Sequence, residues 1–112
     1  MPMFRMLTTF DLEPGTTIDE FRARLERLTR HLVELDLVES VGPVGRRQRH
    51  DVMDTDAERD HEYAFLMNFR DRAQCDRSVE YVYSGKEPAD SIHRAVYQSI
   101  RDPVFSCWED LE

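Results

Sequence analysis

The sequence predicts an α+β fold in which one antiparallel sheet packs against helices. Residues 61 to 71, HEYAFLMNFRD, form a short apolar run with large side chains at both strand parities, which is typical of a strand covered on both faces. Residues 18 to 35 instead repeat apolar side chains at spacings of three and four, which is typical of an amphipathic helix. Such segments follow one another in the order strand, helix, strand, strand, split helix, strand.

The composition fits a single globular domain covering residues 1 to 112, because the chain is 40% apolar and 34% charged. The net charge of -8, from 15 basic and 23 acidic residues, argues against nucleic acid or an anionic membrane as a partner. No apolar run approaches the about 20 residues of a membrane-spanning helix, and the first residues lack signal-peptide features. Because Cys75 and Cys107 form no paired or metal-binding pattern, we expect a cytoplasmic location.

The first strand and the first helix have clear sequence signals. Residues 3 to 12 read as a strand, and Pro14-Gly15 ends it. Thr17 followed by Glu20 is the signature of a capping box at a helix start. The helix that follows is expected to bury one stripe, made of Ile18, Phe21, Leu25, Leu28, Leu32 and Leu35.

The middle of the chain predicts an irregular edge strand and an exposed loop. Residues 37 to 50 carry valines at strand spacing, but Gly42-Pro43 interrupts them, and a proline favours an edge strand or a bulge over a central strand. Residues 51 to 60 are strongly acidic and are expected to form an exposed hairpin loop before the central strand.

The C-terminal third predicts a split helix and a last strand. Asp71 is expected to cap a helix over residues 72 to 83, with Cys75, Val79 and Val82 facing inward, and Ser84-Gly85 stops it. A second helical piece follows Pro88, and Asp102-Pro103 is expected to end it. Its inward stripe comprises Ile92, Ala95, Val96, Ser99 and Ile100. Residues 104 to 111 then read as the final strand.

This element order is the split βαβ arrangement of ferredoxin-like folds. It predicts a four-stranded antiparallel sheet with the helices on one face. The central strand nevertheless carries apolar side chains at both parities, and soluble monomers rarely expose an apolar face of that size. We therefore expect a homodimer in which the sheets of two copies pack together.

Two segments carry a family resemblance. The segment MFRMLTTFDLEPGTT resembles the first strand and turn of the dimeric α/β-barrel superfamily, especially its stress-responsive (Dabb-like) branch. The segment SIHRAVYQSIRDPVFSCWEDL is similar to a small uncharacterised bacterial subfamily of that superfamily. The resemblance implies a ferredoxin-like protomer, two sheets paired into a dimeric α/β barrel, and a cleft between sheet and helices that holds a small organic molecule in some members. The branch often has a histidine on its first strand, where this chain has Met6.

His93 and Tyr97 are the leading site candidates. They lie one helical turn apart, beside the buried stripe of the last helix, and could present a base and a phenol together to a ligand. The alternative is a half-buried surface pair, because the sequence supplies no third group to orient the histidine. Asn68 and Arg47 complete the candidate set.

Asn68 is the one polar residue inside the central strand run, where it could bond a ligand or simply mark the end of the apolar stretch. Arg47, with Arg46 and Arg49, could clamp a carboxylate or could balance the acidic loop.

We expect neither a metal nor a cofactor. An EF-hand loop starting at Asp54 would need glycine and an acid where Arg59 and Phe65 stand, so that motif fails. A looser divalent site in the acidic loop and a solvated loop remain alternatives. Zinc spacings, phosphate-binding glycine loops and serine nucleophile motifs are absent from the sequence.

Two functions follow from these features. The first is a dimer that binds a small organic molecule, or a cofactor-independent enzyme of the proton-transfer, isomerase or monooxygenase type. His93 would then be its base, and Tyr97, Asn68 and Arg47 would line its cleft. The alternative is a non-catalytic structural or stress-related interaction module with a filled core.

Overall fold

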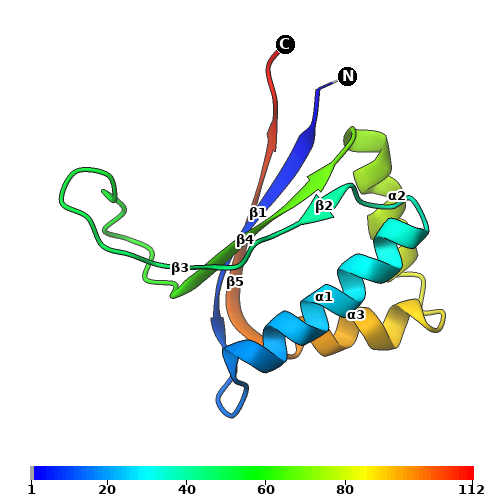
Figure 1. Ribbon diagram of the computed structural model, residues 1–112, viewed down its shortest axis with the longest axis horizontal. Coiled ribbons are helices and arrows are strands. Elements are labelled where there is room, and N and C mark those ends of the chain that lie inside the picture. The colour runs from blue at the N-terminus through cyan, green and yellow to red at the C-terminus, as the bar shows by residue number, and fades with distance from the viewer. Residues whose placement is uncertain (1) are drawn as a thin grey trace.

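The computed structural model describes residues 2–112. Its elements, in chain order, are β1 (Phe4–Leu12), α1 (Ile18–Glu34), β2 (Ser40–Val41), β3 (Gly45–Arg46), β4 (Tyr63–Phe69), α2 (Arg72–Val82), α3 (Ala89–Tyr97) and β5 (Ile100–Glu109). All the helices lie on the same side of the sheet (Figure 1). None of the helices within residues 2–112 is long and apolar enough to cross a membrane.

The sheet is antiparallel, with the order β2-β4-β1-β5, and β3 also pairs with β4. The predicted ferredoxin-like order of strands and helices is therefore confirmed. The expected second strand is divided into β2 and β3, so the sheet has five strands instead of four. The division falls at Gly42 and Pro43, because Gly42 has a φ of +85° and Pro43 has no N–H to donate to the β4 ladder.

Both predicted helix caps are present. The Thr17 hydroxyl accepts a hydrogen bond from the Glu20 backbone N–H at 3.1 Å, and the Glu20 carboxylate accepts one in return from the Thr17 N–H at 3.4 Å. At the start of α2, the Asp71 carboxylate accepts a hydrogen bond from the Gln74 N–H at 2.8 Å. These caps satisfy backbone N–H groups that have no partner inside the helix.

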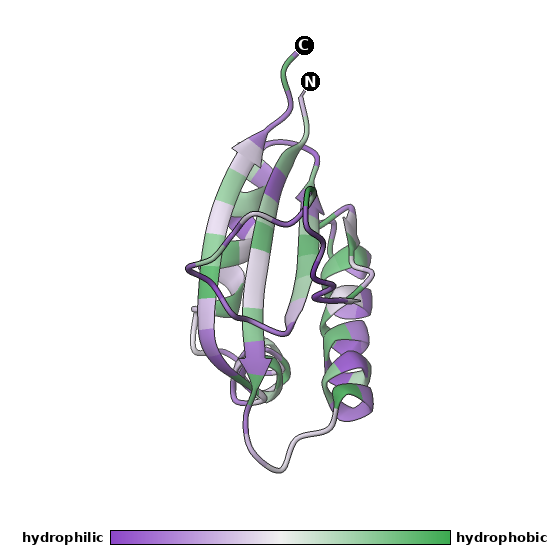
Figure 2. Cartoon of the chain, turned by 90° about the vertical axis from the view of Figure 1, so that its left-hand side faces the viewer, coloured by the Kyte–Doolittle hydropathy of each residue, from purple (hydrophilic) through white to green (hydrophobic). Residues whose placement is uncertain are grey.

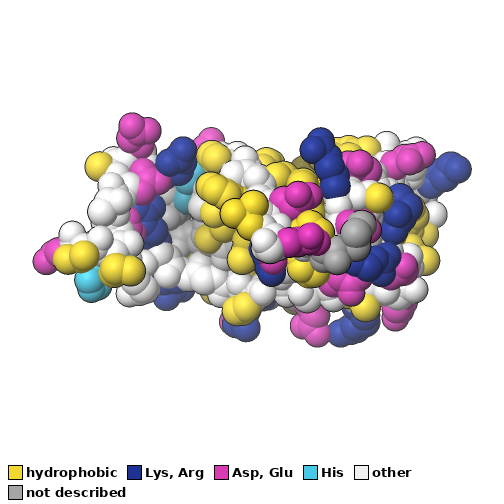
Figure 3. Space-filling model, turned by 90° about the horizontal axis from the view of Figure 1, so that it is seen from above, with side chains coloured by type: hydrophobic (Ala, Val, Ile, Leu, Met, Phe, Trp, Pro, Cys, Tyr) yellow, Lys and Arg dark blue, Asp and Glu magenta, His cyan; other side chains and the backbone are white. Residues whose placement is uncertain are grey.

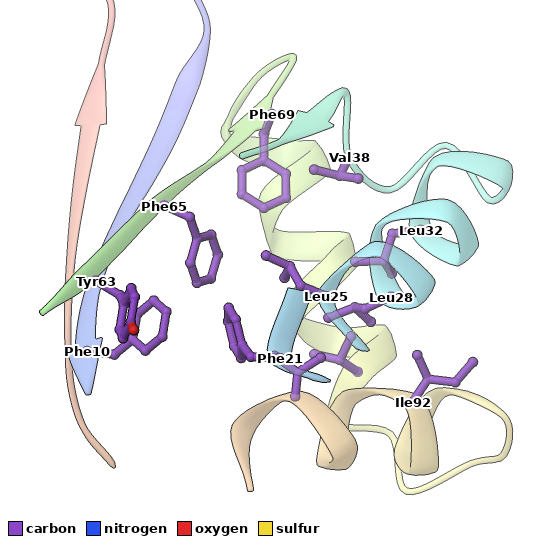
Figure 4. Packing of buried hydrophobic residues seen from close by; sticks show 12 residues of the cluster. Phe10, Phe21, Leu25, Leu28, Leu32, Val38, Tyr63, Phe65, Phe69 and Ile92 are labelled. Atoms are coloured by element: carbon purple, nitrogen blue, oxygen red, sulfur yellow. The ribbon is translucent and has the colours of Figure 1, made fainter. Parts of the chain in front are cut away.

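The core lies between the sheet and α1. The ring centroids of Phe10 on β1 and Phe21 on α1 are 4.7 Å apart, and Phe65 on β4 lies 5.7 Å from Phe10 (Figure 4). The predicted α1 stripe is buried from Phe21 to Leu32. Ile18 is only partly buried, and Leu35 is exposed because it is the C-cap residue, with a side chain 46% exposed.

The last helix ends, and the last strand begins, earlier in the chain than the sequence predicted. The helix ends at Tyr97 and β5 begins at Ile100, so the prediction of a strand starting at residue 104 was wrong. Pro103 does not break β5, because β5 is an edge strand and can lack one N–H donor. A register shift between Thr9 and Asp11 on β1 accompanies this irregular stretch.

The inward face of α2 is more polar than predicted. Val79 is 49% exposed, whereas Gln74 and Ser78 are buried. The Gln74 side chain accepts from the Arg70 N–H at 2.7 Å and donates to the Asp36 carbonyl at 3.1 Å, and the Ser78 hydroxyl donates to the Leu37 carbonyl. These side chains bond the backbone that leads into and out of the sheet, a role that apolar residues cannot fill.

One face of the sheet carries no helix. In Figure 2, the strands lie in view with only a thin loop crossing in front of them. The strand registers place Leu7 beside Leu66 on this face, and the exposed fractions of Leu66, Val104 and Trp108 are 37%, 42% and 65%. We call this surface the uncovered face.

The loop between β3 and β4 projects from the side of the sheet that carries no helix (Figure 1), and we call residues 47–62 the arm. The Arg47 guanidinium donates to both carboxylate oxygens of Asp54, at 2.5 and 2.7 Å, and to the carbonyls of Asp56 and Arg59, each at 2.9 Å. The prediction of an exposed acidic loop is confirmed. Its acidic side chains Asp54, Asp56 and Asp60 are each paired with an arginine.

Candidate ligand-binding cavity

A cavity of about 300 Å³ lies between the sheet and the helices. The sheet contributes Met6, Phe65 and Met67 to its wall, and α1 contributes Leu25, Leu28 and Leu32. Its polar or ionisable lining side chains are Thr8, Cys75, Ser78, Tyr83, His93 and Tyr97. An apolar, recessed space with a few polar groups is the usual form of a binding site for a small organic molecule.

A larger groove of about 420 Å³ runs along the outside of α1. Its lining includes Asp19, Arg22 and Glu26, and it meets the Gly42-Pro43 interruption of the edge strand. This groove is open to solvent, whereas the cavity lies within the layered core. We therefore regard the cavity as the better candidate for an organic ligand.

Thr8 places a hydroxyl in the cavity wall. Its side chain is fully buried, at 0% exposure, and its Oγ1 has no hydrogen-bond partner within the described residues. A buried hydroxyl without a partner costs about 1–3 kcal/mol, so a ligand oxygen or nitrogen that bonds it would remove that cost. Sequence analysis did not select Thr8. The available signal was its position on the inward side of an otherwise apolar strand.

His93 lies on α3 at the helical end of the cavity. Its ring is half-buried between two tyrosines, with centroid distances of 5.1 Å to Tyr83 and 5.2 Å to Tyr97. Burial lowers the pKa of the His93 imidazole below its ordinary value, and the Asp90 carboxylate partly opposes this by raising it. The imidazole is therefore mainly neutral at pH 7 and has a free lone pair that can accept a proton.

The structure brings together two of the four predicted site residues. His93 and Tyr97 both line the cavity, as their spacing on the helix predicts. Asn68 instead points to the uncovered face, where its carbonyl accepts from Arg5 at 2.7 Å and its amide donates to Ser40 at 3.0 Å. The strand parity explains this, because Phe65, Met67 and Phe69 occupy the inward positions of β4.

Arg47 is the second predicted residue that the cavity does not include. Its guanidinium is bound within the arm, and Thr9 of β1 lines the hollow between the arm and the uncovered face. The Arg47 guanidinium thus holds the pKa of the Asp54 carboxyl below its usual value. The arginines around position 47 therefore shape a loop.

Cys75 also contacts the cavity. Burial raises the pKa of the Cys75 thiol, and the nearby Cys107 and Asp76 add to the increase. The thiol is therefore protonated at neutral pH and is a weak nucleophile. Its contribution to the cavity is apolar surface.

No protein-family model matches the chain, and no curated protein sequence matches it. Solved structures do match over almost its whole length. A dimeric ferredoxin-like protein of unknown function from Jannaschia is similar with a TM-score of 0.61 and 19% identity, covering 98% of each chain. The fold is ferredoxin-like.

Two further ferredoxin-like neighbours have more informative names. A Dabb family protein from Mesorhizobium loti has a TM-score of 0.61 and 16% identity, with 100% of both chains covered. SnoaB, a cofactor-independent oxygenase from Streptomyces nogalater, has a TM-score of 0.61 and 9% identity, covering 100% of this chain and 96% of its own. These neighbours share the ferredoxin-like fold over almost the whole chain.

Proposed function

We propose that the protein is a homodimer in which each protomer binds a small, mainly apolar organic molecule between the sheet and the helices. The observation that carries this proposal is the Thr8 hydroxyl, which is fully buried in a residue that lines the cavity and has no hydrogen-bond partner within residues 2–112. The cavity volume of about 300 Å³ lies at the lower end of the range for organic ligands. If the protein were instead an interaction module, side chains would be expected to fill the space between the sheet and the helices.

We propose cofactor-independent proton transfer as the chemistry of this cavity. A neutral His93 nitrogen takes a proton from an acidic O–H or C–H bond of the bound molecule. The electron pair moves onto a ligand oxygen, which accepts hydrogen bonds from the Thr8 hydroxyl or the Tyr97 phenol. Return of the proton to a different atom gives an isomerisation. SnoaB is a cofactor-independent oxygenase, which supports the cofactor-independent part of this proposal.

The homodimer proposal rests on the uncovered face. Leu7, Leu66, Val104 and Trp108 form an apolar surface there, and the arm stands to one side of it. Seen from above, a hollow separates the arm from hydrophobic side chains on the body of the protein (Figure 3). A second copy stacked sheet to sheet would cover the apolar surface and fill this hollow. Dimeric neighbours of the same fold support this arrangement.

We also propose a cytoplasmic location. Both Cys75 and Cys107 are free thiols, and Cys107 is exposed on the surface. An exposed free thiol is more compatible with a reducing compartment than with an oxidising one. Fractionation of cells that express the native protein would test this.

The binding proposal is tested by calorimetric titration with β-naphthol, which combines an apolar ring body with a single hydroxyl. We expect saturable binding to the folded protein and a rise of its melting temperature by mass action. Thr8→Val removes the hydroxyl at nearly constant volume and should weaken binding by about three- to tenfold. His93→Gln should weaken the binding of β-naphthol less than Thr8→Val does, because His93 is assigned to proton transfer and not to holding the hydroxyl.

Thr9→Val is the matched control, because Thr9 is the next residue on β1 and its hydroxyl is also buried without a partner, yet it does not line the cavity. The affinity of the Thr9→Val variant for β-naphthol should equal that of the unaltered protein. Equal weakening by both valine substitutions, or no binding of β-naphthol at all, would contradict the assignment of the cavity as the binding site.

A further inference from the structure

A second hollow lies against the helical end of the cavity. It has a volume of about 250 Å³ and is lined by Val82, Tyr83, Gly85, Asp90, His93 and Tyr97. All of these except Gly85 and Asp90 also line the larger cavity. We call the larger cavity the inner chamber and the second hollow the outer chamber. The shared side chains form the partition between the chambers.

The partition is a row of three aromatic rings. The His93 ring lies between Tyr83, at an interplanar angle of 76°, and Tyr97, at 59°. Tyr83 is 72% exposed and Tyr97 is 48% exposed, so both phenols have room to change rotamer. Exposed side chains change rotamer on the picosecond to nanosecond timescale. Rotation of these phenols would change the separation between the chambers without any movement of the backbone.

The two chambers differ in chemistry. The inner chamber is lined mainly by aliphatic and aromatic side chains; its buried polar groups are the Ser78 hydroxyl, which bonds the Leu37 carbonyl, and the unpartnered Thr8 hydroxyl. The outer chamber contains the Asp90 carboxylate and the two phenols. Asp90 is paired with Arg94, but an ionised carboxylate has about four acceptor positions, so it can accept a further hydrogen bond.

We propose that the natural ligand spans both chambers, with an apolar ring body in the inner chamber and a hydroxyl or amine group in the outer chamber that donates a hydrogen bond to Asp90. This rests on the proposed function and adds to it the chemical class of the ligand. A carboxylate at the same end of the ligand is disfavoured, because it would lie beside a second carboxylate. The ligand is thus amphiphilic and carries no anionic group at its outer end.

Calorimetric titration of the full chain with four probes tests this. The probes are β-naphthol itself and its derivatives with a propyl, a hydroxypropyl or a carboxyethyl tail on the ring remote from the hydroxyl. We expect the hydroxypropyl tail to bind about three- to tenfold more tightly than the propyl tail, which has nearly the same size. The carboxyethyl tail should bind more weakly than the propyl tail.

In Asp90→Asn, the carboxyethyl probe should no longer bind more weakly than the propyl probe. Asp51→Asn is the control, because it makes the same charge change at an exposed position of the arm. If the carboxyethyl probe still binds more weakly than the propyl probe in Asp90→Asn, the proposed role of Asp90 is wrong. If β-naphthol binds but the hydroxypropyl and propyl tails bind equally, the two-chamber inference fails while the proposed function stands. If none of the four probes binds, both fail.

Discussion

Thr8 and Thr9 are neighbours on β1, yet their side chains face opposite sides of the sheet. Thr8 faces the helices and the cavity, whereas Thr9 faces the side without helices and lies beneath the arm. Both hydroxyls are buried and have no partner within the described residues. One strand therefore presents an unsatisfied group to each of two different environments.

The difference between the two faces lies in what can cover them. The helix-side face is closed by α1, α2 and α3 of the same chain, and the remaining space is small enough for an organic molecule. The uncovered face carries no helix, and its large apolar side chains, such as Trp108 at 65% exposure, remain in contact with solvent. We infer that the helix-side face binds a ligand and that the uncovered face binds a second copy of the chain.

The largest expected effect belongs to the helix-side face. Phe21→Ala should lower the free energy of unfolding by about 3–5 kcal/mol, because Phe21 is fully buried against Phe10 and Phe65 and its removal leaves a hole. Urea unfolding followed by circular dichroism measures the change. Val33→Ala, at a position of α1 that is 46% exposed, should cost far less. Equal costs would mean that the core is not organised around this aromatic cluster.

The next largest effect is on dimerisation, and it tests the role of the uncovered face. Leu66→Asp places a charge at the centre of the uncovered face and should weaken the dimer by about a hundredfold, or about 2.8 kcal/mol, because the charge would be buried between the sheets. Sedimentation velocity over a range of concentrations measures the dissociation constant. Val33→Asp introduces the same charge on the exposed side of α1 and should leave the dimer intact. Dimerisation of Leu66→Asp at the normal concentration would rule out the sheet-to-sheet interface.

A smaller effect is a gain in stability on substitution of a buried residue. In the absence of a ligand, Thr8→Val should raise the free energy of unfolding by about 1 kcal/mol, because an unpartnered buried hydroxyl is replaced by a methyl group of the same size. The same variant should bind β-naphthol less tightly. Thermal unfolding with and without the ligand measures both changes. A destabilised ligand-free variant would mean that the Thr8 hydroxyl has a partner inside the folded protein.

The smallest effect concerns the protonation of His93. Because burial is the main cause of its lowered pKa, the His93 signal in a proton NMR titration should have a midpoint below the ordinary value of 6.5. Asp90→Asn should move that midpoint lower still, because Asp90 raises the pKa.

The unfolded chain then binds more protons than the folded chain between the two pKa values, so this histidine makes the free energy of unfolding rise with pH through that window. A midpoint at 6.5 in the unaltered protein would show that His93 is solvated, and one above 6.5 would show that it is paired with an acid.

Sequence reasoning recovered the elements because their signals are local. The spacing of Phe21, Leu25, Leu28 and Leu32 defines the buried side of α1, and Thr17 and Asp71 begin helices through hydrogen bonds to residues three positions away. The early start of β5 could not be read locally. Pro103 is tolerated there only because β5 is at the sheet edge, and that position depends on how distant strands pair.

The candidate site was predicted in part for the same reason. The spacing of His93 and Tyr97 on one helix is enough to place them together, and both line the cavity. Strand parity already separates Asn68 from the inward residues of β4, although its polarity within an apolar run drew attention to it. Arg47 could be assigned only after the arm was seen to fold around its guanidinium.

The sequence by itself determined the order of the elements, the helix caps and the presence of apolar side chains on both faces of the central strand. Each of these depends on residues within a few positions of one another. The tertiary structure alone decided that a cavity remains beneath the helices, that Thr8 lines it with a buried hydroxyl that has no partner within the described residues, and that Tyr83 joins His93 and Tyr97 in one aromatic row. Those features depend on how well surfaces from distant segments fill the space between them, and packing of that kind leaves no periodic signal in the chain.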